Sequence, residues 1–400
     1  MTRISVAAIA VLLFTATPAF AQPETRGSHT FTTWDAGHIT LAGASIPVMV
    51  YYPTDAGGPF PVVAVVHGAS RNMSYMAEMA RTFASRGFVA VTPSIPCTVF
   101  GCDHAANARQ VRALLDWTVA QSADASSMIS GRVDGERRGV VGHSWGGLAV
   151  FLAAQGHPEI DAVVTLDPND DAGIAAAAAS TVVQPSAHVM AQVMGTCNAT
   201  NWKDTVFPST PSPHMRVVVT GAGHCDVEDP TDALCPSFCN AGAGSSVTPY
   251  FRRYAVAFMG CVLQSDTAMA PYIGGTSLAD DTSAGHLQYV STNGLDLLPC
   301  NGGTLPDAGV IASDAGTPGV DAATSAHDAA IVMSDSGSVS SDSGSPGRDA
   351  AVVATSDAST PAAPAAGGCG CRAVRAPLHA TTLALAALAL ALVSRARRRS

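Results

Sequence analysis

The chain contains the stretch Val140-Val141-Gly142-His143-Ser144-Trp145-Gly146-Gly147, in which a serine stands between two glycines. A nucleophilic serine must occupy a tight turn between a strand and a helix if its hydroxyl is to project from the edge of a sheet. Glycines two positions before and two after it let the backbone make that turn without clashes. Residues 138–142 have the pattern of a strand and residues 148–154 that of a helix. The stretch therefore predicts a strand–turn–helix unit with Ser144 as a nucleophile.

Strands and helices alternate on both sides of this turn. Apolar runs predict strands over residues 46–52, 61–66, 88–92, 138–142, 161–166, 187–194 and 215–220. Helical spacing of apolar residues predicts helices over residues 73–86, 105–120, 148–154 and 247–263. This order predicts an α/β fold, with a mostly parallel central sheet and helices on both faces. Residues 168–186 are too few for a large cap domain, so we expect an open, lidless cleft.

A nucleophilic serine needs a base, and the predicted base is His224. It stands on the glycine-rich loop Gly221-Ala222-Gly223-His224, directly after the apolar strand 215–220. In this kind of fold the nucleophile, the acid and the base follow one another along the chain, each just past the end of a strand. Other histidines have weaker positions, in the turn itself, at a helix end, at strand starts or beyond the last predicted helix: His143, His157, His188, His214 and His286.

The predicted acid is Asp167, which follows the next strand in Leu166-Asp167-Pro168. The more usual place for this acid, after the strand that follows, holds Gly195-Thr196-Cys197-Asn198, with no carboxylate until Asp204. Asp170 and Asp171 are close to Asp167 but are interpreted as part of a solvated turn. Asp167 is therefore preferred, and Asp204 stays open as its competitor.

The negative oxygen formed in acyl transfer needs two N–H donors aimed at it. One is predicted to be the backbone N–H of Trp145, directly after the nucleophile. The other is predicted to be that of Ala69, in the loop that follows strand 61–66. Met73, Tyr75 and Met76 are expected to line the substrate groove together with Trp145, although an interpretation of these residues as helix core stays open.

Five motifs together resemble one branch of the α/β-hydrolases. They are His67-Gly68-Ala69-Ser70, Gly131-Arg132-Val133-Asp134, the stretch from Gly142 to Gly147, Leu166-Asp167-Pro168 and Gly221-Ala222-Gly223-His224-Cys225-Asp226. Over about residues 45–265 the chain is similar to the chlorophyllase and platelet-activating-factor acetylhydrolase branch and to its bacterial cutinase-like relatives. The resemblance implies hydrolysis of carboxylic esters without a cofactor, and it supports Asp167 as the acid. The cysteines at positions 197, 225, 235 and 239 depart from the pattern.

The cysteines between residues 22 and 300 are even in number, which in an exported protein predicts disulfides rather than a metal site. Cys97 and Cys102 are placed to close a short loop. Cys197 and Cys225 follow neighbouring strands and are expected to tie the acid-side loop to the base loop. The pairing of the others is not determined by the sequence. Cys235 and Cys239 have the spacing of half a zinc site, but no second ligand pair matches, so no metal is predicted.

Both ends of the chain have the patterns of targeting signals. Residues 1–21 combine Arg3, an apolar run and Ala19-Phe20-Ala21, which predicts a secretory signal peptide. Residues 301–366 carry an aspartate at every seventh position among Gly, Ser, Ala and Pro, which predicts a disordered linker. Residues 367–400 combine a Cys motif, an apolar run and an Arg cluster, and this order resembles the MYXO-CTERM sorting tails. We therefore expect export, anchoring at the cell surface or outer membrane, and a sorting protease as partner. Whether the tail is cleaved stays open.

The expected catalytic domain spans residues 22–300, with membrane contact only through the tail. The net charge of −10 argues against a nucleic-acid partner, which would require a basic face. The predicted function is that of a secreted, surface-anchored serine ester hydrolase of the carboxylesterase or lipase kind. It would act through a Ser-His-Asp triad and an acyl-enzyme intermediate on small, lipid or polymeric esters. A serine peptidase and a catalytically silent binding module on the same fold are the alternatives. The acyl and alcohol specificity and the oligomeric state are not determined by the sequence.

Overall fold

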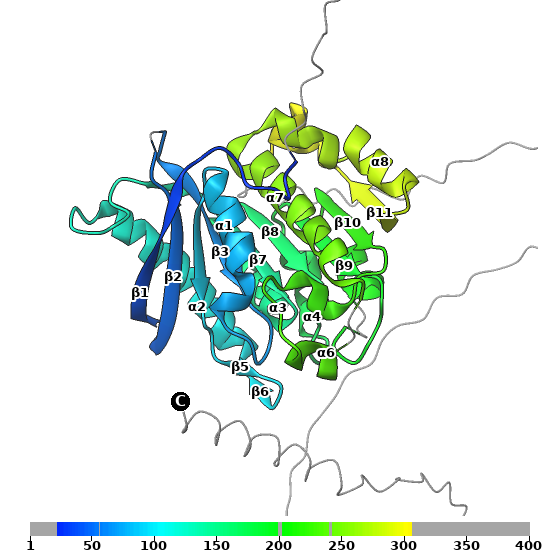
Figure 1. The fold of residues 1–400 in the computed structure, drawn as a ribbon, viewed down its shortest axis with the longest axis horizontal. Helices are drawn as coiled ribbons and strands as arrows, with labels where there is room; N and C mark the ends of the chain where they lie inside the picture. Colours follow the sequence, from blue (N-terminus) through cyan, green and yellow to red (C-terminus); the bar gives the residue numbers. More distant parts are fainter. Residues whose placement is uncertain (1–21, 56, 199–201, 240–241, 306–400) are drawn as a thin grey trace, which may run out of the picture. The chain divides into compact units, whose positions relative to one another are not determined.

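The described residues form a central nine-stranded sheet (Figure 1). The computed structural model describes residues 22–55, 57–198, 202–239 and 242–305. The strands of the sheet are β1 (Phe31–Leu41), β2 (Ala44–Pro53), β3 (Phe60–Val66), β4 (Val89–Pro93), β7 (Val133–His143), β8 (Ala162–Leu166), β9 (Ser186–Ala191), β10 (His214–Val219) and β11 (Leu287–Asn293). Their order across the sheet is β1-β2-β4-β3-β7-β8-β9-β10-β11.

The middle of the sheet is parallel and its edges are antiparallel. Every neighbouring pair from β4 to β10 is parallel. In contrast, β1 pairs with β2, β2 with β4 and β11 with β10 in antiparallel fashion. The prediction of a mostly parallel sheet is confirmed. The sequence did not reveal β1 and β11, because both are partly exposed and polar side chains interrupt their apolar pattern. It also missed the hairpin of β5 (Cys97–Thr98) and β6 (Gly101–Cys102).

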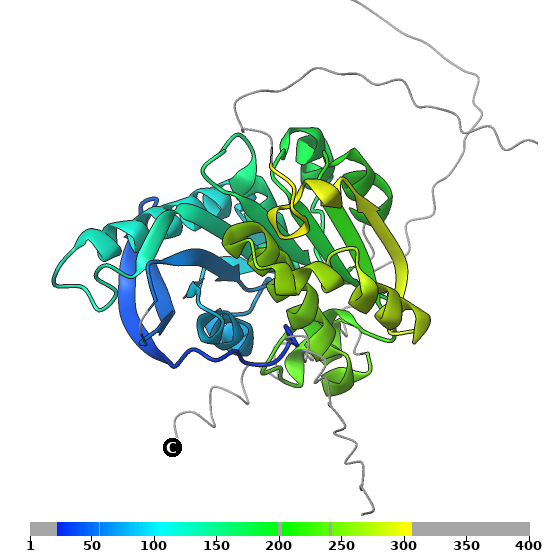
Figure 2. The ribbon, with the colours of Figure 1, turned by 90° about the horizontal axis from the view of Figure 1, so that it is seen from above.

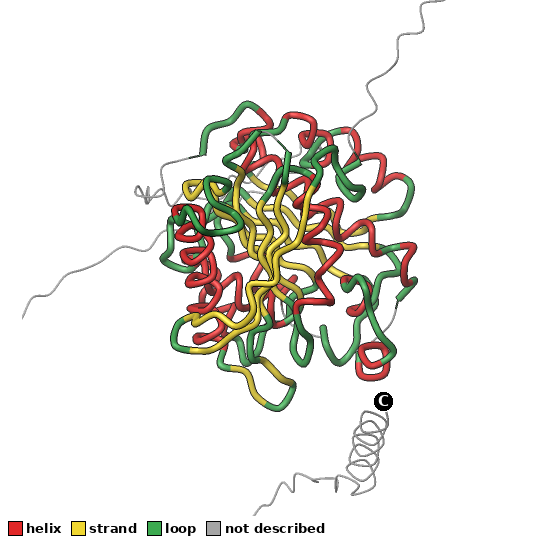
Figure 3. The backbone as a smooth tube through the Cα atoms, turned by 60° about the vertical axis from the view of Figure 1, so that its left-hand side comes forward, coloured by secondary structure: helices red, strands yellow, loops and turns green. Residues whose placement is uncertain are grey.

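The central strands carry apolar side chains on both faces, and helices cover both faces of the sheet. In β3, Val63 and Val65 belong to one hydrophobic core, whereas the alternate residues Val62, Ala64 and Val66 belong to a second. The first core is covered by α1 (Ala77–Ser85) and α7 (Thr248–Gln264), and the second by α2 (His104–Ala123), α3 (Trp145–Ala154) and α4 (Ile174–Ala178). Figures 2 and 3 show the helices on the two sides of the twisted strands. This layering confirms the predicted α/β architecture.

The predicted helices are present, with one of them divided. Residues 73–86 form a 3-10 turn, η1 (Met73–Met76), followed by α1, and the Oδ1 atom of Asn72 caps η1 by accepting from the Ser74 N–H at 2.9 Å. The connection between β8 and β9 holds only α4 and the short turn η2 (Ala179–Thr181), which leaves no room there for a large cap domain. The other short helical elements are η3 (Trp202–Val206), α5 (Phe207–Ser209), η4 (His224–Val227), α6 (Leu234–Phe238), η5 (Gly244–Ser246), η6 (Thr267–Tyr272), α8 (Thr276–Ser283), η7 (Leu295–Leu297) and η8 (Pro299–Asn301).

Disulfides join the cysteines of the described residues in four pairs. The predicted bond between Cys97 and Cys102 is confirmed, and it closes the β5–β6 hairpin. The expected bond between Cys197 and Cys225 was wrong, because the segment after His224 folds back as α6 and offers each of these cysteines a nearer partner. Cys197 bonds Cys239, and Cys225 bonds Cys235.

The fourth disulfide fixes the last described segment to the end of α7. Cys261, near that end, bonds Cys300. The same end of α7 contacts β7, where Arg137 Nη1 donates to the backbone carbonyl of Leu263 at 3.0 Å. The next residue, Arg138, donates its N–H to Asp161 directly before β8, so this contact lies at the level where β8 begins. The segment around Cys300 is therefore held at the amino ends of the parallel strands.

The predicted signal peptide, the sorting tail and nearly all of the predicted linker lie outside the described residues. Among the helices of the described ranges, none has the length and apolar character needed to cross a bilayer.

Three buried histidines make the folded state sensitive to acid. Burial lowers the pKa of His67 to about 4 and that of His188 to about 3, and burial together with nearby His224 holds the pKa of His143 well below 6.5. Below pH 6.5 the unfolded chain therefore binds protons that the folded chain does not, and stability falls as the pH falls. Asp161 opposes this trend. Burial raises its pKa to about 6 in the folded chain, so just below pH 6 the folded chain binds a proton at this carboxyl that the unfolded chain does not.

We expect a net difference of about two protons near pH 5, so that the free energy of unfolding falls by about 3 kcal/mol per pH unit at its steepest. Urea unfolding at pH 7, 6 and 5 with the disulfides intact measures this slope. The variant His38→Gln is the control, since this side chain is exposed on β1. Equal unfolding midpoints from pH 7 to 5 would contradict the prediction.

Candidate active site

Ser144 occupies the turn between β7 and α3 in a strained backbone conformation. Its φ and ψ angles are 56° and −126°, where few residues other than glycine are found. The turn is held by hydrogen bonds from the Ser144 N–H to the Leu166 carbonyl and from the Leu148 N–H to the Ser144 carbonyl, both at 3.1 Å. A Cβ atom on Gly142 would collide with the backbone of Gly146. Only glycine fits at this position, as the sequence motif predicts.

Asp167 and His224 form a buried hydrogen-bonded pair. Asp167 directly follows β8, and His224 begins η4 after β10. The Nδ1 atom of His224 donates to Oδ2 of Asp167 at 2.6 Å, and the two residues are 3% and 1% exposed. Because Nδ1 carries the donated hydrogen, Nε2 is left with a free lone pair, as a general base requires. The other carboxylate oxygen, Oδ1, accepts from the Ala191 N–H at 2.9 Å.

The competing carboxylates lie in other surroundings. Asp204 is exposed on η3. Asp161 lies at the start of β8, where it accepts from the Arg138 N–H at 2.7 Å. The interpretation of Asp170 as part of a solvated turn was wrong: this residue is 8% exposed and caps α4 by accepting from the N–H groups of Ala175 and Ala176. Asp171 is hydrogen-bonded through Oδ2 to His104 Nε2 at 2.9 Å.

The predicted oxyanion donors lie on two neighbouring turns. Trp145 is the first residue of α3, so its N–H has no acceptor within the helix. Ala69 follows β3, and a Cβ atom on adjacent Gly68 would come within 3.0 Å of the Ser144 Cβ, so the Ala69 loop packs directly against Ser144. Ser70 anchors this loop to the β5–β6 hairpin. Its N–H donates to the Cys97 carbonyl at 2.8 Å, and its Oγ accepts from the Val99 N–H at 3.1 Å.

The residues expected to line the groove have different surroundings. Met76 is 1% exposed and packs in the core beneath α1, so its assignment to the groove was wrong. Met73 and Tyr75 are partly exposed. The Tyr75 hydroxyl donates to Asp232 at 2.6 Å, and the Arg71 guanidinium lies 3.9 Å from the Tyr75 ring centre. The ring of Trp145 packs edge-to-face against His104.

A buried ion pair that the sequence did not suggest joins the loop of Ala69, the predicted oxyanion loop, to the loop of His224. Arg71 donates from Nε and Nη2 to the two carboxylate oxygens of Glu228, at 2.7 and 2.6 Å. Burial disfavours the Arg71 charge, but hydrogen bonds to Glu228 and Asp232 raise its pKa above the ordinary value. Next to this pair, the Nε2 atom of His143 donates to the His224 carbonyl at 3.0 Å. No local pattern links positions so far apart in the chain, so sequence periodicity could not find the pair.

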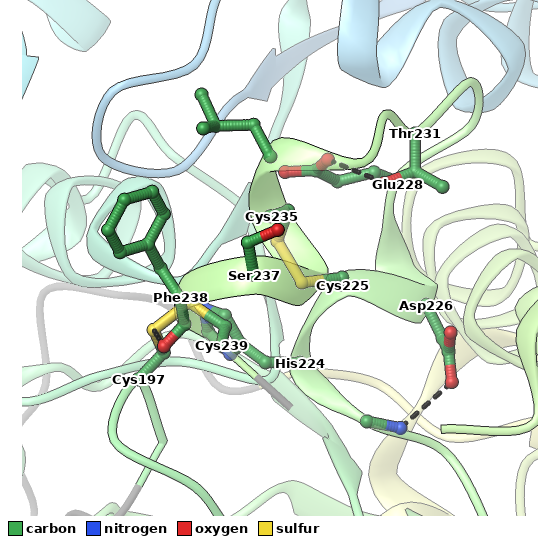
Figure 4. The surroundings of a disulfide bond; sticks show 12 residues. Cys197, His224, Cys225, Asp226, Glu228, Thr231, Cys235, Ser237, Phe238 and Cys239 are labelled. Carbon is green, nitrogen blue, oxygen red and sulfur yellow. Dashed lines mark hydrogen bonds between the residues drawn. A yellow bond between two sulfur atoms is a disulfide. The ribbon is translucent and has the colours of Figure 1, made fainter. Parts of the chain in front are cut away.

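Disulfides surround His224, the predicted base (Figure 4). The sulfur atoms of Cys197 and Cys239 lie within 4.8 Å of a ring nitrogen of His224, and those of Cys225, Cys235 and Cys239 form a second close group. All of these sulfurs are paired in disulfides. A paired sulfur does not serve as the thiolate ligand that a zinc site needs. Figure 4 also shows Phe238 beside the Cys197–Cys239 bond.

Known proteins similar to this chain are esterases of one kind. Residues 15–198 match the PETase family, which is described as PET hydrolase-like. The fold is that of the α/β-hydrolases. The match contains Ser144 and Asp167 and ends before His224. Similarity to this family supports the cutinase-like side of the resemblance drawn from the sequence motifs.

Individual relatives are similar over a shorter stretch. The chain is 34% identical over 120 residues to a bis(hydroxyethyl) terephthalate hydrolase of Streptomyces coelicolor, which is 30% of this chain and 36% of the relative. It is 33% identical over 119 residues to cutinase 2 of Thermobifida cellulosilytica and to cutinase cut1 of Thermobifida fusca. These stretches are 30% of this chain and 43% and 35% of the two relatives. The chain therefore matches well under half the length of these relatives.

Proposed function

We propose that this chain is an exported serine hydrolase that cleaves carboxylic esters through Ser144, His224 and Asp167. The observation that carries the proposal is the buried hydrogen bond of 2.6 Å between His224 Nδ1 and Asp167 Oδ2. It lies at the same edge of the sheet as the strained turn of Ser144, because β7, β8 and β10 run parallel and all three residues follow the carboxyl ends of these strands. The names of the similar proteins, cutinases and a terephthalate ester hydrolase, support an ester as substrate.

The reaction follows from these positions. His224 takes the proton of the Ser144 hydroxyl at Nε2, and the serine oxygen attacks the carbonyl carbon of the ester. The N–H groups of Ala69 and Trp145 donate to the oxyanion, and losing one such donor typically raises the barrier by about 3 kcal/mol. His224 then returns the proton to the departing alcohol. Water attacks the acyl-enzyme in the same way and releases the acid. The Asp167 carboxylate stabilises the imidazolium throughout, and no cofactor takes part.

Exposed apolar side chains next to the site support an apolar ester as the substrate. Val99 and Phe100, in the β5–β6 hairpin, are 62% and 98% exposed, and Leu234 and Phe238, on α6, are 53% and 71% exposed. The hairpin is hydrogen-bonded to the oxyanion loop through Ser70. We call these four side chains the apolar rim. Figure 1 shows β5, β6 and α6 at the same end of the sheet. We propose that the rim binds the surface of an insoluble or polymeric ester.

The double variant Phe100→Ser/Phe238→Ser tests the rim. Burying a phenyl group contributes about 2 kcal/mol, so hydrolysis of a polyester film or emulsified ester is expected to fall at least about tenfold. Turnover of soluble p-nitrophenyl acetate is expected to change less than about twofold, because neither residue belongs to the triad. The matched control is Tyr289→Ser, an equally exposed aromatic (72%) on β11. Equal losses on the film and on the soluble ester would contradict a role in surface binding.

A fluorophosphonate probe and an ester panel test the proposed function itself. We expect the full-length protein to be labelled at Ser144 and to cleave p-nitrophenyl esters of short, medium and long acyl chains. A folded protein that neither reacts with the probe nor cleaves any ester would instead be a silent binding module. Labelling without ester cleavage, together with cleavage of peptide substrates, would indicate a serine peptidase.

We further propose export and attachment at the cell surface. The disulfides of the described residues support an oxidising compartment. The signal peptide and the MYXO-CTERM-like tail are proposals drawn from the sequence, as is processing of that tail by a sorting protease. Cell fractionation of the protein with and without residues 367–400 tests attachment: surface retention is expected only for the full chain.

A further inference from the structure

Asn198 shares the catalytic oxygen of Asp167 with His224. Its Nδ2 atom donates to Asp167 Oδ2 at 2.9 Å, and the same oxygen accepts from His224 Nδ1 at 2.6 Å. Asn198 is 4% exposed. It follows β9, which is the parallel neighbour of the strand that carries Asp167. The side chain therefore lies at the position that the acid more usually occupies in this fold. The Oδ2 atom of Asp167 links it to the His224 ring through two hydrogen bonds.

The orientation of the Asn198 amide is set by its other partners. Its Oδ1 atom accepts from the Gly195 N–H at 2.7 Å, and Nδ2 also donates to the Val193 carbonyl at 3.1 Å. A rotated amide would place an oxygen against both that carbonyl and the Asp167 carboxylate. The N–H groups of Asn198 must therefore face Asp167. Every donor of this amide is used, and one of them is used on the oxygen that binds the base.

We propose that Asn198 is a positioning residue that fixes the Asp167 carboxylate on His224, and that its place is a second acid position of the same site. This inference rests on the proposed function for its catalytic meaning. The amide suits a carboxylate neighbour because it is neutral and donates a hydrogen bond. Two carboxylates at this spacing repel one another and share a proton. The site therefore accepts one acid at a time, and an aspartate at position 198 orients His224 when Asp167 is absent.

The test compares Asn198→Ala, Asn198→Asp, Asp167→Gly and the double variant Asp167→Gly/Asn198→Asp in the full chain. Glycine is chosen at 167 because φ is +39° there, which glycine adopts without strain, and because it leaves space for a neighbouring carboxylate. Asn198→Ala is expected to lower kcat about 10- to 100-fold with KM within about twofold, since a misplaced acid misplaces the base. Asn198→Asp alone is also expected to lower kcat. The kcat of the double variant is expected to exceed the kcat of Asp167→Gly at least about tenfold, although the double variant carries one more substitution.

The control is Asn301→Ala. This amide also donates to two backbone carbonyls, those of Ile273 and Leu295, but it lies in η8 near the opposite end of the sheet. It is expected to leave kcat unchanged. Circular dichroism and thermal unfolding check the fold of each variant.

A second measurement does not depend on ester turnover. The proton between His224 Nδ1 and the carboxylate is expected to give a low-field resonance in the ¹H NMR spectrum. It should be present in the wild type, shifted in Asn198→Ala, lost in Asp167→Gly and regained in the double variant. Two results would overturn the inference. One is a folded double variant that gains neither kcat nor the resonance, and the other is an Asn198→Ala protein with wild-type kcat and an unmoved resonance. If the wild type shows the resonance but cleaves no ester, the proposed function fails and the second acid position is decided by the resonance.

Discussion

Replacing Ser144 with alanine is expected to lower ester turnover about a millionfold, the loss typical of removing a triad nucleophile. The fold should be unchanged. Alanine keeps the Cβ atom of serine, so the strain at φ 56° is the same, and the turn is set by the glycines and by backbone hydrogen bonds rather than by the hydroxyl. Steady-state kinetics with a p-nitrophenyl ester, together with fluorophosphonate labelling, measures the effect.

The matched control is Ser246→Ala, which removes an exposed hydroxyl on η5. It should retain full turnover and labelling. Turnover by Ser144→Ala within about tenfold of the wild type would remove Ser144 from the proposed role.

Asp167→Asn is expected to lower turnover about ten-thousandfold, by analogy with the acid of other triads. The amide of an asparagine can present an N–H to His224 Nδ1, which forces the hydrogen of the imidazole onto Nε2, where the lone pair is needed. The loss should appear in kcat, because Asp167 is 1% exposed and does not reach a bound substrate. Kinetics over a range of ester concentrations separates kcat from KM.

Asp204→Asn is the comparison variant, because Asp204 was the competing acid and is exposed on η3. It is expected to stay near wild-type turnover. The reverse pattern, a large loss for Asp204→Asn and a small one for Asp167→Asn, would transfer the role of the acid to Asp204.

Features encoded by neighbouring residues were predictable from the sequence. Most of the parallel strands contain apolar runs. Ser144 and Asp167 directly follow two of these strands, and His224 follows a third after a short glycine-rich loop. Because parallel strands end at the same edge of a sheet, their order along the chain was enough to expect a common site. The structure then brings Asp167 and His224 into contact.

Features that depend on distant contacts were not predictable in this way. The helical spacing of Met76 in the sequence fits a residue of the groove as well as a residue of the core. Only the packing of η1 and α1 against the sheet places it in the core. Cys197 was expected to pair with Cys225, and only the course of the chain after His224 brings it to Cys239. Arg71 and Glu228 meet through the approach of two loops. The sequence places Asn198 at the usual acid position, but its hydrogen bond to Asp167 depends on how two separate loops approach one another.

The bond between Cys261 and Cys300 also decides where a force on the C-terminal side of the chain enters the folded domain. It fixes the last described segment near Arg137 of β7, at the level where β8 begins, whereas Ser144 follows the carboxyl end of β7. A pull transmitted through the C-terminal side of the chain therefore acts on the edge of the sheet opposite to the proposed catalytic residues.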